Sequence, residues 1–318
     1  MQIELVAVKT AKFSILSNIS LTLSKFIIGI IIGSISIISE AIHSFVDLLA
    51  ALMAYYAVKK ASMPPDKAHP YGYGKFENIS GIIEALLIFI AAIYIVYESI
   101  KKLLYPSSIN MPVVGILVML FSVLVNFFVS RKLFYVAKEM DSVALEANAW
   151  HLRADVYTSI GIMFVLSIIT FIDIFKFHAN IFYWLDSIAA FVVAFMITKT
   201  AWKLISKSAK DLFDASLPNK EISIIENVIC QNDDIVGYHA LKTRKSGNKR
   251  FVEFHILVNP KMTVYRSHEI TREINFEVSG RLENSIVTIH VEPCDNTCTL
   301  KCLEGCLIKA CKSVNIRK

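Results

Sequence analysis

A chain of 318 residues with 55% hydrophobic and only 19% charged residues is too apolar for an ordinary soluble protein. Soluble domains usually have about 45–50% apolar residues and roughly a quarter charged ones. The mean hydropathy of +0.53 therefore favours an integral membrane protein. The net charge of +6 is modest, and the sequence has no basic stripe with interleaved aromatic residues, so we expect no nucleic-acid partner.

Six apolar segments are long enough to cross a bilayer, because a hydrocarbon core of about 30 Å requires roughly 20 helical residues. These segments are 12–32, 36–58, 78–100, 112–134, 146–171 and 182–204. They are separated by stretches rich in Gly, Pro, Ser or charged residues at 33–36, 63–75, 105–110, 131–142 and 173–180. The sequence thus predicts six transmembrane helices.

The loops differ in their content of Lys and Arg, which predicts orientation. The N-terminal segment and the loops 59–77 and 131–142 carry two, four and three such residues. The loops on the opposite side carry none, two and one. We therefore expect both termini on the cytoplasmic side.

After about residue 209 the chain changes to the pattern of a soluble domain. An amphipathic helix is predicted at 219–232, two strands around a Ser-Gly-Asn turn at 237–258, a second helix at 265–282 and a third strand at 285–292. The order αββαβ predicts two helices on one face of a small sheet. The expected domains are 1–208 in the membrane, 209–293 in the cytoplasm, and a Cys-rich tail over 294–318.

Two of the apolar segments contain His and Asp four residues apart, namely His43 with Asp47 and His151 with Asp155. Ionisable residues are costly inside a bilayer, so they indicate function by default. A spacing of four places both side chains on one helix face. Two such pairs facing each other would supply the nitrogen and oxygen ligands of a tetrahedral Zn²⁺ site. Alternatively, each pair is a buried hydrogen-bonded couple that fixes helix packing.

A membrane zinc hydrolase is a competing interpretation. Catalytic zinc sites usually keep three protein ligands and one open position for water, whereas four protein ligands fill the coordination sphere. Glu40 and Glu146 could serve as a base, but each lies about one turn towards the N-terminal end of its helix. The pattern therefore favours a carrier of metal ions over an enzyme, and no catalytic residue is assigned.

The ordered motifs SEAIHSFVDLLA, PPDKAHPYGYGKFE, HLRADVYTSIG, YWLDSIAA and DLFDASLP resemble the cation diffusion facilitator family of metal transporters. The resemblance runs from about residue 12 to 293. It implies a homodimer of six-span protomers with a cytoplasmic αββαβ domain of the metallochaperone type. It also implies export of a divalent metal in exchange for protons.

Carried onto this sequence, the family's transport site is His43, Asp47, His151 and Asp155. Two-His, two-Asp sites imply a preference for Zn²⁺, and imidazole suits Zn²⁺ better than Mn²⁺. Fe²⁺, Co²⁺ and Cd²⁺ remain alternative substrates. Metal binds only neutral imidazole and ionised carboxylate, so loading releases protons, and His43 and His151 are the expected carriers.

Two further pairs follow from the resemblance. Asp66 and His69 correspond to a metal site in the loop between two spans, but its usual third ligand is Tyr73 here, so a weak two-ligand site and a structural Pro-Gly turn are both open. Lys75 and Asp214 correspond to a charge interlock between the membrane and cytoplasmic domains.

Strand alternation places His255, His290 and Glu292 on a polar sheet face, opposite Val287, Ile289 and Val291. By resemblance, the cytoplasmic domain holds a regulatory binuclear zinc site at the dimer interface. Its ligands in this chain would be His239, His255, His268, His290 and Glu292.

The tail contains five cysteines in the pattern C-x3-C-x3-C-x3-C-x4-C, namely Cys294, Cys298, Cys302, Cys306 and Cys311. Cytoplasmic thiols are normally reduced, which disfavours disulfides. A thiolate site for Zn²⁺, Cu⁺ or an iron–sulfur cluster and a reduced, metal-free tail are both open.

The sequence thus predicts a dimeric, α-helical zinc/proton antiporter of a prokaryotic plasma membrane, with Zn²⁺ as substrate and regulatory ligand. The alternatives are a broader exporter of Fe²⁺, Co²⁺ or Cd²⁺, and a membrane-anchored metal sensor or metallochaperone without transport. A sensor would need only the cytoplasmic ligands, so the four intramembrane residues disfavour it.

Overall fold

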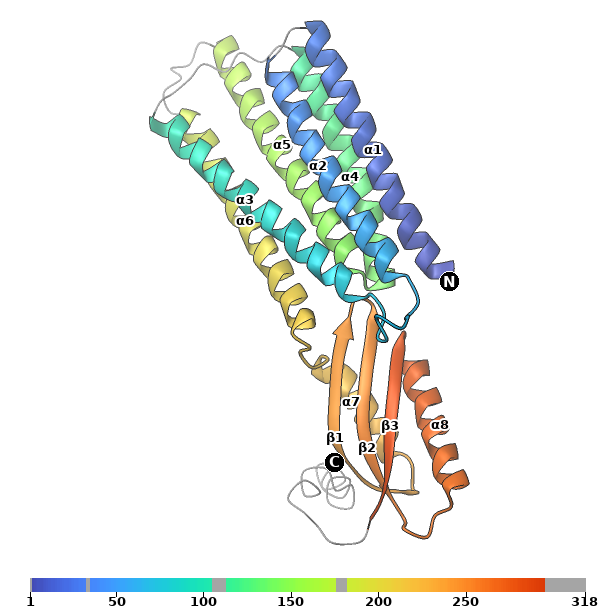
Figure 1. Ribbon diagram of the computed structural model, residues 1–318. Helices are drawn as coiled ribbons and strands as arrows, with labels where there is room; N and C mark the ends of the chain where they lie inside the picture. Colours follow the sequence, from blue (N-terminus) through green and yellow to red (C-terminus); the bar gives the residue numbers. More distant parts are fainter. Residues whose placement is uncertain (1, 33–34, 105–112, 176–181, 295–318) are drawn as a thin grey trace. The chain divides into compact units, whose positions relative to one another are not determined.

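The computed structural model describes residues 2–32, 35–104, 113–175 and 182–294. The chain divides into two compact units, Met1–Ala209 and Lys210–Lys318. The first unit is helical and the second contains the sheet (Figure 1).

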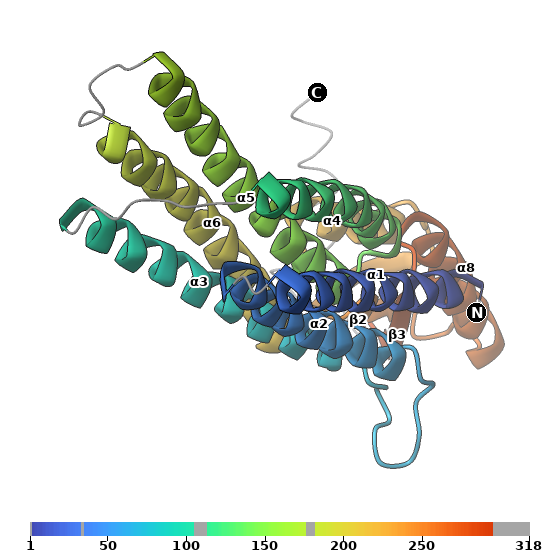
Figure 2. The same ribbon diagram turned by 90° about the horizontal axis from the view of Figure 1, so that it is seen from above.

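The helical unit is built from long helices in an up-and-down arrangement (Figures 1 and 2). These are α1 (Gln2–Ile32), α2 (Ile35–Ala61), α3 (Lys75–Leu104), α4 (Val113–Met140), α5 (Val143–Phe175) and α6 (Phe182–Leu212). Several of them are longer than the predicted apolar segments, because amphipathic turns with charged residues continue the helix at one or both ends. In α1, for example, the helix starts ten residues before the predicted span.

Among the described residues, four helices are long and apolar enough to cross a membrane. Their candidate spans are Val6–Ile28, Ala41–Ala61, Lys75–Lys101 and Met119–Met140. The break between α4 and α5 lies within the predicted stretch 131–142 but only at its end, since α4 continues to Met140. Only Asp141, with a φ of 49°, and Ser142 separate α4 from α5. The charged residues at the end of α4 are helical because a helix can continue beyond the end of an apolar segment.

Small side chains let the helices approach closely, as is common between membrane helices. One core joins Ala7 and Ala11 of α1 to Ala57 of α2, Leu133 of α4 and Leu145 of α5. A second core joins α3, α5 and α6 through Ala85, Ile88, Ala147, Ile197 and Ala201. A Cβ atom at Gly81 of α3 would lie 2.8 Å from Ser208 Oγ and 2.9 Å from Val143 Cγ1, so only glycine fits at this contact.

The second unit follows the order α7 (Asn219–Cys230), β1 (Ile235–Ser246), β2 (Lys249–Val258), α8 (Val264–Arg281) and β3 (Ser285–Pro293). The sheet order is β1-β2-β3, with β1 and β2 antiparallel and β2 and β3 parallel. Gly247, at a φ of 60°, supplies the left-handed turn of the β1–β2 hairpin.

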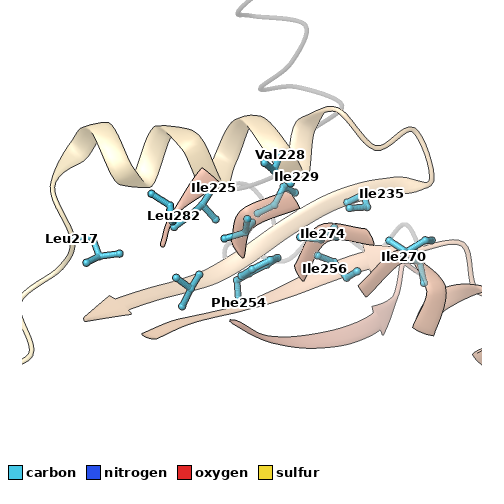
Figure 3. Close-up of a cluster of buried hydrophobic side chains, with 13 residues drawn as sticks. Leu217, Ile225, Val228, Ile229, Ile235, Phe254, Ile256, Ile270, Ile274 and Leu282 are labelled. Atoms are coloured by element: carbon cyan, nitrogen blue, oxygen red, sulfur yellow. The ribbon is translucent and has the colours of Figure 1, made fainter. Parts of the chain in front are cut away.

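Both helices of this unit pack on the same side of the sheet (Figure 3). Ile225 and Ile229 of α7 and Ile274 of α8 meet Phe254 and Ile256 of β2, and all five side chains are buried. Because side chains alternate along a strand, the odd-numbered residues of β2 face the opposite side of the sheet. His255 belongs to that second face.

Candidate metal centres

The two predicted His–Asp pairs meet between α2 and α5. Ligand atoms of His43, Asp47 and Asp155 all lie within 4.8 Å of one another. His43 Nε2 is 4.0 Å from Asp47 Oδ1 and 3.6 Å from Asp155 Oδ1. His151 joins the same group through Asp47, with 3.0 Å between Nε2 and Oδ1. The structure therefore brings all four residues together, with Asp47 contacting both imidazoles.

The four side chains differ in exposure. Side-chain exposure is 6% for Asp47, 7% for His151 and 18% for Asp155, but 52% for His43. The other three side chains are thus held inside the helix group, while His43 lies at its accessible edge.

Polar side chains from α1 surround the α2 half of this group. Asn18 Nδ2 lies 3.5 Å from the carbonyl oxygen of Asp47. Lys25 is 4% exposed, and its Nζ donates a hydrogen bond of 2.8 Å to Ser44 Oγ, next to His43 in the chain. The α1 helix thus places a lysine side chain beside the site, a feature that the sequence analysis missed. The presence of a lysine within an apolar segment is the sequence feature that could have indicated it.

Of the two glutamates considered as a base, Glu146 has a partner outside this group. Glu146 forms an ion pair with Lys207 of α6, with 2.6 Å between Oε2 and Nζ. This pairing gives Glu146 a structural partner at the start of α5. The side chain of Glu40 lies outside the residues whose side chains are described.

In the loop between α2 and α3, the Asp66 carboxylate is already engaged by its own loop. Its Oδ1 accepts hydrogen bonds from the N–H groups of Ala68 and His69, and its Oδ2 accepts one of 2.5 Å from the Tyr73 hydroxyl. The Tyr73 hydrogen bond, followed by that from His69, lowers the pKa of Asp66, and the same carboxylate raises the pKa of Tyr73. His69 Nδ1 lies 3.6 Å from Asp66 Oδ1. These contacts are typical of a turn in which the Asp66 side chain caps the backbone N–H groups of its own loop.

The predicted interlock residues fall in different units. Lys75 is the first residue of α3, and Asp214 lies in the second unit, two residues beyond the end of α6. Within its own unit, Asp214 Oδ1 lies 3.4 Å from Arg244 Nη1.

The second candidate centre lies on the open face of the sheet. Strand register aligns His239, His255 and His290 in one row across β1, β2 and β3. Glu292 Oε2 lies 2.9 Å from His239 Nε2, and its Oε1 lies 2.8 Å from His255 Nδ1. Ligand atoms of His239, His255 and Glu292 all lie within 4.8 Å of one another. One carboxylate therefore bridges two imidazoles from two neighbouring strands.

The remaining two predicted ligands stand apart from this group. His290 Nε2 is 3.6 Å from Glu292 Oε1, and its side chain is 64% exposed. His268 lies on α8, whose buried residues pack against the helix-covered face of the sheet, and it is exposed. Within the described part of one chain, His268 is therefore not among the residues gathered on the open face.

The electrostatics of the sheet site favour an ionised carboxylate. Burial by itself would raise the pKa of Glu292, but hydrogen bonds from His239 and His255 outweigh it and lower the pKa below the ordinary value of 4.5. An ionised carboxylate next to two imidazoles is a suitable donor set for Zn²⁺.

Of the predicted tail ligands, only Cys294 is described. Its backbone N–H donates to the carbonyl oxygen of Val258, which extends the β2–β3 pairing by one residue. Cys298, Cys302, Cys306 and Cys311 lie outside the described residues.

Residues 11–213 match the family profile described as the cation efflux transmembrane domain. Residues 217–294 match the profile described as the cation efflux protein, cytoplasmic domain. The first match alone covers well over half of the chain. The chain therefore belongs to the cation efflux family, also called the cation diffusion facilitator family.

Two relatives match most of the chain, and one solved structure matches a quarter of it. A transporter of Synechocystis sp. named only as uncharacterized is 32% identical over 267 residues, which cover 84% of each chain. The cation-efflux pump FieF of Shewanella oneidensis is 23% identical and covers 89% of this chain and 93% of the pump. The metal-bound C-terminal domain of the CzcD transporter from Thermotoga maritima is 34% identical over 25% of this chain and 93% of that domain, with a TM-score of 0.24.

Family membership and the apolar helices define the class of protein. The chain is a helical membrane transporter of divalent metal cations, with a C-terminal domain that contains a small sheet. It is a transporter rather than an enzyme.

Proposed function

We propose that this protein exports Zn²⁺ from the cytoplasm across the plasma membrane in exchange for protons, by alternating access. The observation that carries the proposal is the convergence of His43, Asp47 and Asp155, with His151 held on Asp47 at 3.0 Å. Two imidazoles and two carboxylates match the ligand preference of Zn²⁺ and would fill a tetrahedral sphere.

Proton coupling follows from the chemistry of these ligands. Metal ions require neutral imidazole and ionised carboxylate, so protons and metal compete for the same atoms. In the described geometry, the His151 ring nitrogen and the Asp47 carboxylate share a short polar contact that a metal ion would have to replace. Exchange of one kind of cation for the other therefore needs no additional residue at the site.

A six-span membrane domain is part of the proposal. In addition to the four candidate spans, α5 has 33 residues and α6 has 31. At 1.5 Å per residue, about 20 residues suffice to cross the bilayer core. Six crossings would return both termini to the cytoplasmic side that the Lys and Arg distribution predicts.

We propose that the sheet site is regulatory and that the protein works as a homodimer. His239, His255 and Glu292 would bind one metal ion within a chain. His290 and His268 stand outside this group, so a site shared by two copies would give them ligand roles. The αββαβ order of the second unit fits a metallochaperone-like domain that closes on cytoplasmic Zn²⁺ and favours transport.

A broader exporter of Fe²⁺, Co²⁺ or Cd²⁺ is the second candidate, because the same donor set accepts these ions. The deciding experiment is uptake of Zn²⁺, Fe²⁺, Co²⁺, Cd²⁺ and Mn²⁺ by proteoliposomes that contain the full chain, with internal pH recorded in parallel. We expect Zn²⁺ transport with opposite proton flux, and loss of both in a His43→Ala, His151→Ala variant. Transport of another metal without Zn²⁺ would replace the proposed substrate, and metal binding without any flux would favour the sensor.

A further inference from the structure

Three lysines from three helices gather on the outer surface of the helical unit. Lys12 Nζ of α1 lies 5.9 Å and Lys59 Nζ of α2 lies 5.8 Å from the centre of the same ring, that of Tyr55. Lys132 Nζ of α4 lies 4.2 Å from the ring centre of Phe13, the residue that follows Lys12. Because α1 packs against both α2 and α4, these three lysines form one surface, called the basic patch below.

The charge of the basic patch is not balanced by ion pairs within the described part of the chain. None of its three lysines forms an ion pair with a described carboxylate, and all three are exposed. Two ammonium groups beside one aromatic ring repel each other, and an aromatic face attracts an exposed cation only weakly. An anion placed against the basic patch would compensate this repulsion.

The basic patch lies where the phosphate layer of a bilayer is within reach. Each of its lysines belongs to one of the candidate membrane spans of α1, α2 and α4. A lysine that faces hydrocarbon is costly, so its side chain extends towards the nearest layer of headgroups. The phosphate groups of that layer are therefore the anions that these three ammonium groups can contact.

The outer face of α1 continues from the basic patch as an apolar stripe. Lys9, Lys12 and Phe13 are exposed, on the side of α1 opposite the buried Ala7 and Ala11. The same side continues at helical spacing with exposed aliphatic side chains, namely Leu16, Leu23, Ile27 and Ile30. Along α1 the order is thus ammonium groups, an aromatic ring and aliphatic side chains, which matches the order of headgroup, interface and acyl chain in a phospholipid.

We propose that the basic patch binds the headgroup of an anionic phospholipid, whose acyl chain lies along the apolar stripe of α1. A headgroup phosphate would contact lysines of α1, α2 and α4 together and would hold the three helices to one another at this end. By the distribution of Lys and Arg this end faces the cytoplasm, and the cytoplasmic leaflet is the one with a negative surface. The inference does not depend on which metal is transported or on its coupling to protons.

The test is titration of the detergent-solubilised full chain with phosphatidylglycerol, with bound lipid counted by native mass spectrometry. The patch variant Lys12→Gln, Lys59→Gln, Lys132→Gln should bind this lipid about 100-fold more weakly, since each lysine near an anionic surface contributes roughly fivefold. The matched control removes three exposed lysines of α6, in Lys199→Gln, Lys203→Gln, Lys210→Gln, and should keep the wild-type affinity. Phosphatidylcholine, whose headgroup is zwitterionic, should bind more weakly than phosphatidylglycerol to the wild type and equally to the patch variant.

Equal affinity of the patch variant and the wild type for phosphatidylglycerol would overturn the inference, and so would equal binding of the two lipids by the wild type. Displacement of the lipid by inorganic phosphate, but not by chloride at the same ionic strength, would assign the patch to a free anion instead. If the patch variant fails to fold, Lys132→Gln alone provides the test. It should bind the lipid about fivefold more weakly, and an unchanged affinity would contradict the site.

Discussion

His151 Nε2 lies 3.0 Å from Asp47 Oδ1, a contact that joins α5 to α2 across 104 residues of sequence. The same carboxylate oxygen is 4.0 Å from His43 Nε2. His43 Nε2 also lies 3.6 Å from Asp155 Oδ1. The two halves of the proposed transport site therefore meet through Asp47 and His43 of α2.

Replacing Asp47 with Asn should reduce Zn²⁺ transport to background, because the neutral amide removes the negative charge shared by both imidazoles. His43→Asp should retain transport and broaden the choice of metal, since an oxygen ligand suits harder cations. Zn²⁺ and Mn²⁺ uptake into proteoliposomes would measure both effects. Full Zn²⁺ transport by Asp47→Asn would exclude this carboxylate as a ligand.

Gly81→Ala should destabilise the membrane unit. The new Cβ atom would lie 2.8 Å from Ser208 Oγ and 2.9 Å from Val143 Cγ1. Overpacking costs about 1–3 kcal/mol, which exceeds the gain of at most about 1 kcal/mol from replacing glycine in a helix. Gly161→Ala is the matched control, since the nearest atom to its Cβ among the described residues would be Val193 Cγ2, at 3.8 Å. Thermal unfolding in detergent should show a lower Tm for the first variant only.

Glu146→Gln should leave transport intact. Its ion pair with Lys207 is partly exposed, with side-chain exposures of 29% and 39%, so we expect a loss of stability of about 0–1 kcal/mol. Exchanging the two residues, Glu146→Lys with Lys207→Glu, should recover that loss. Abolished transport in a stably folded Glu146→Gln protein would instead assign this carboxylate a role in the reaction.

The sheet site should show a defined dependence on pH. The pKa of Glu292 is lowered in the folded state, so its contribution to stability is fully present above its ordinary value of 4.5 and is lost as pH falls through the lowered folded pKa. Denaturant titrations of the metal-free full chain from pH 7 down to pH 3 would reveal this loss. Glu292→Gln should remove that part of the pH dependence and weaken Zn²⁺ binding at the sheet; an identical pH profile in the variant would contradict the assignment.

Asp66→Ala should leave the number of bound Zn²⁺ ions unchanged, because this carboxylate is engaged by Tyr73 and by two backbone N–H groups of its own loop. Equilibrium dialysis of the full chain would count the ions. His255→Ala, which removes a member of the sheet group, provides the positive control. If Asp66→Ala bound one Zn²⁺ ion fewer than the wild type, the loop would be a metal site after all.

The sequence was sufficient to predict the class of protein and to nominate the residues of the proposed transport site. Long apolar segments, the His–Asp spacing of four and the ordered motifs are local features, and they depend only on helix periodicity and on the cost of charge in lipid. Strand alternation likewise placed His255, His290 and Glu292 on one face, because side chains alternate along any strand.

Only the tertiary structure decided which of these residues meet. The sequence could not show that Glu292 bridges His239 and His255, since strand register determines that contact. Nor could it separate Glu146, which pairs with Lys207, from Glu84, whose Oε2 is buried without a partner. Both are glutamates on long helices, and their difference comes from the neighbouring helix that each one faces. Burial and pairing are properties of packing between distant segments, and the sequence of one segment does not contain them.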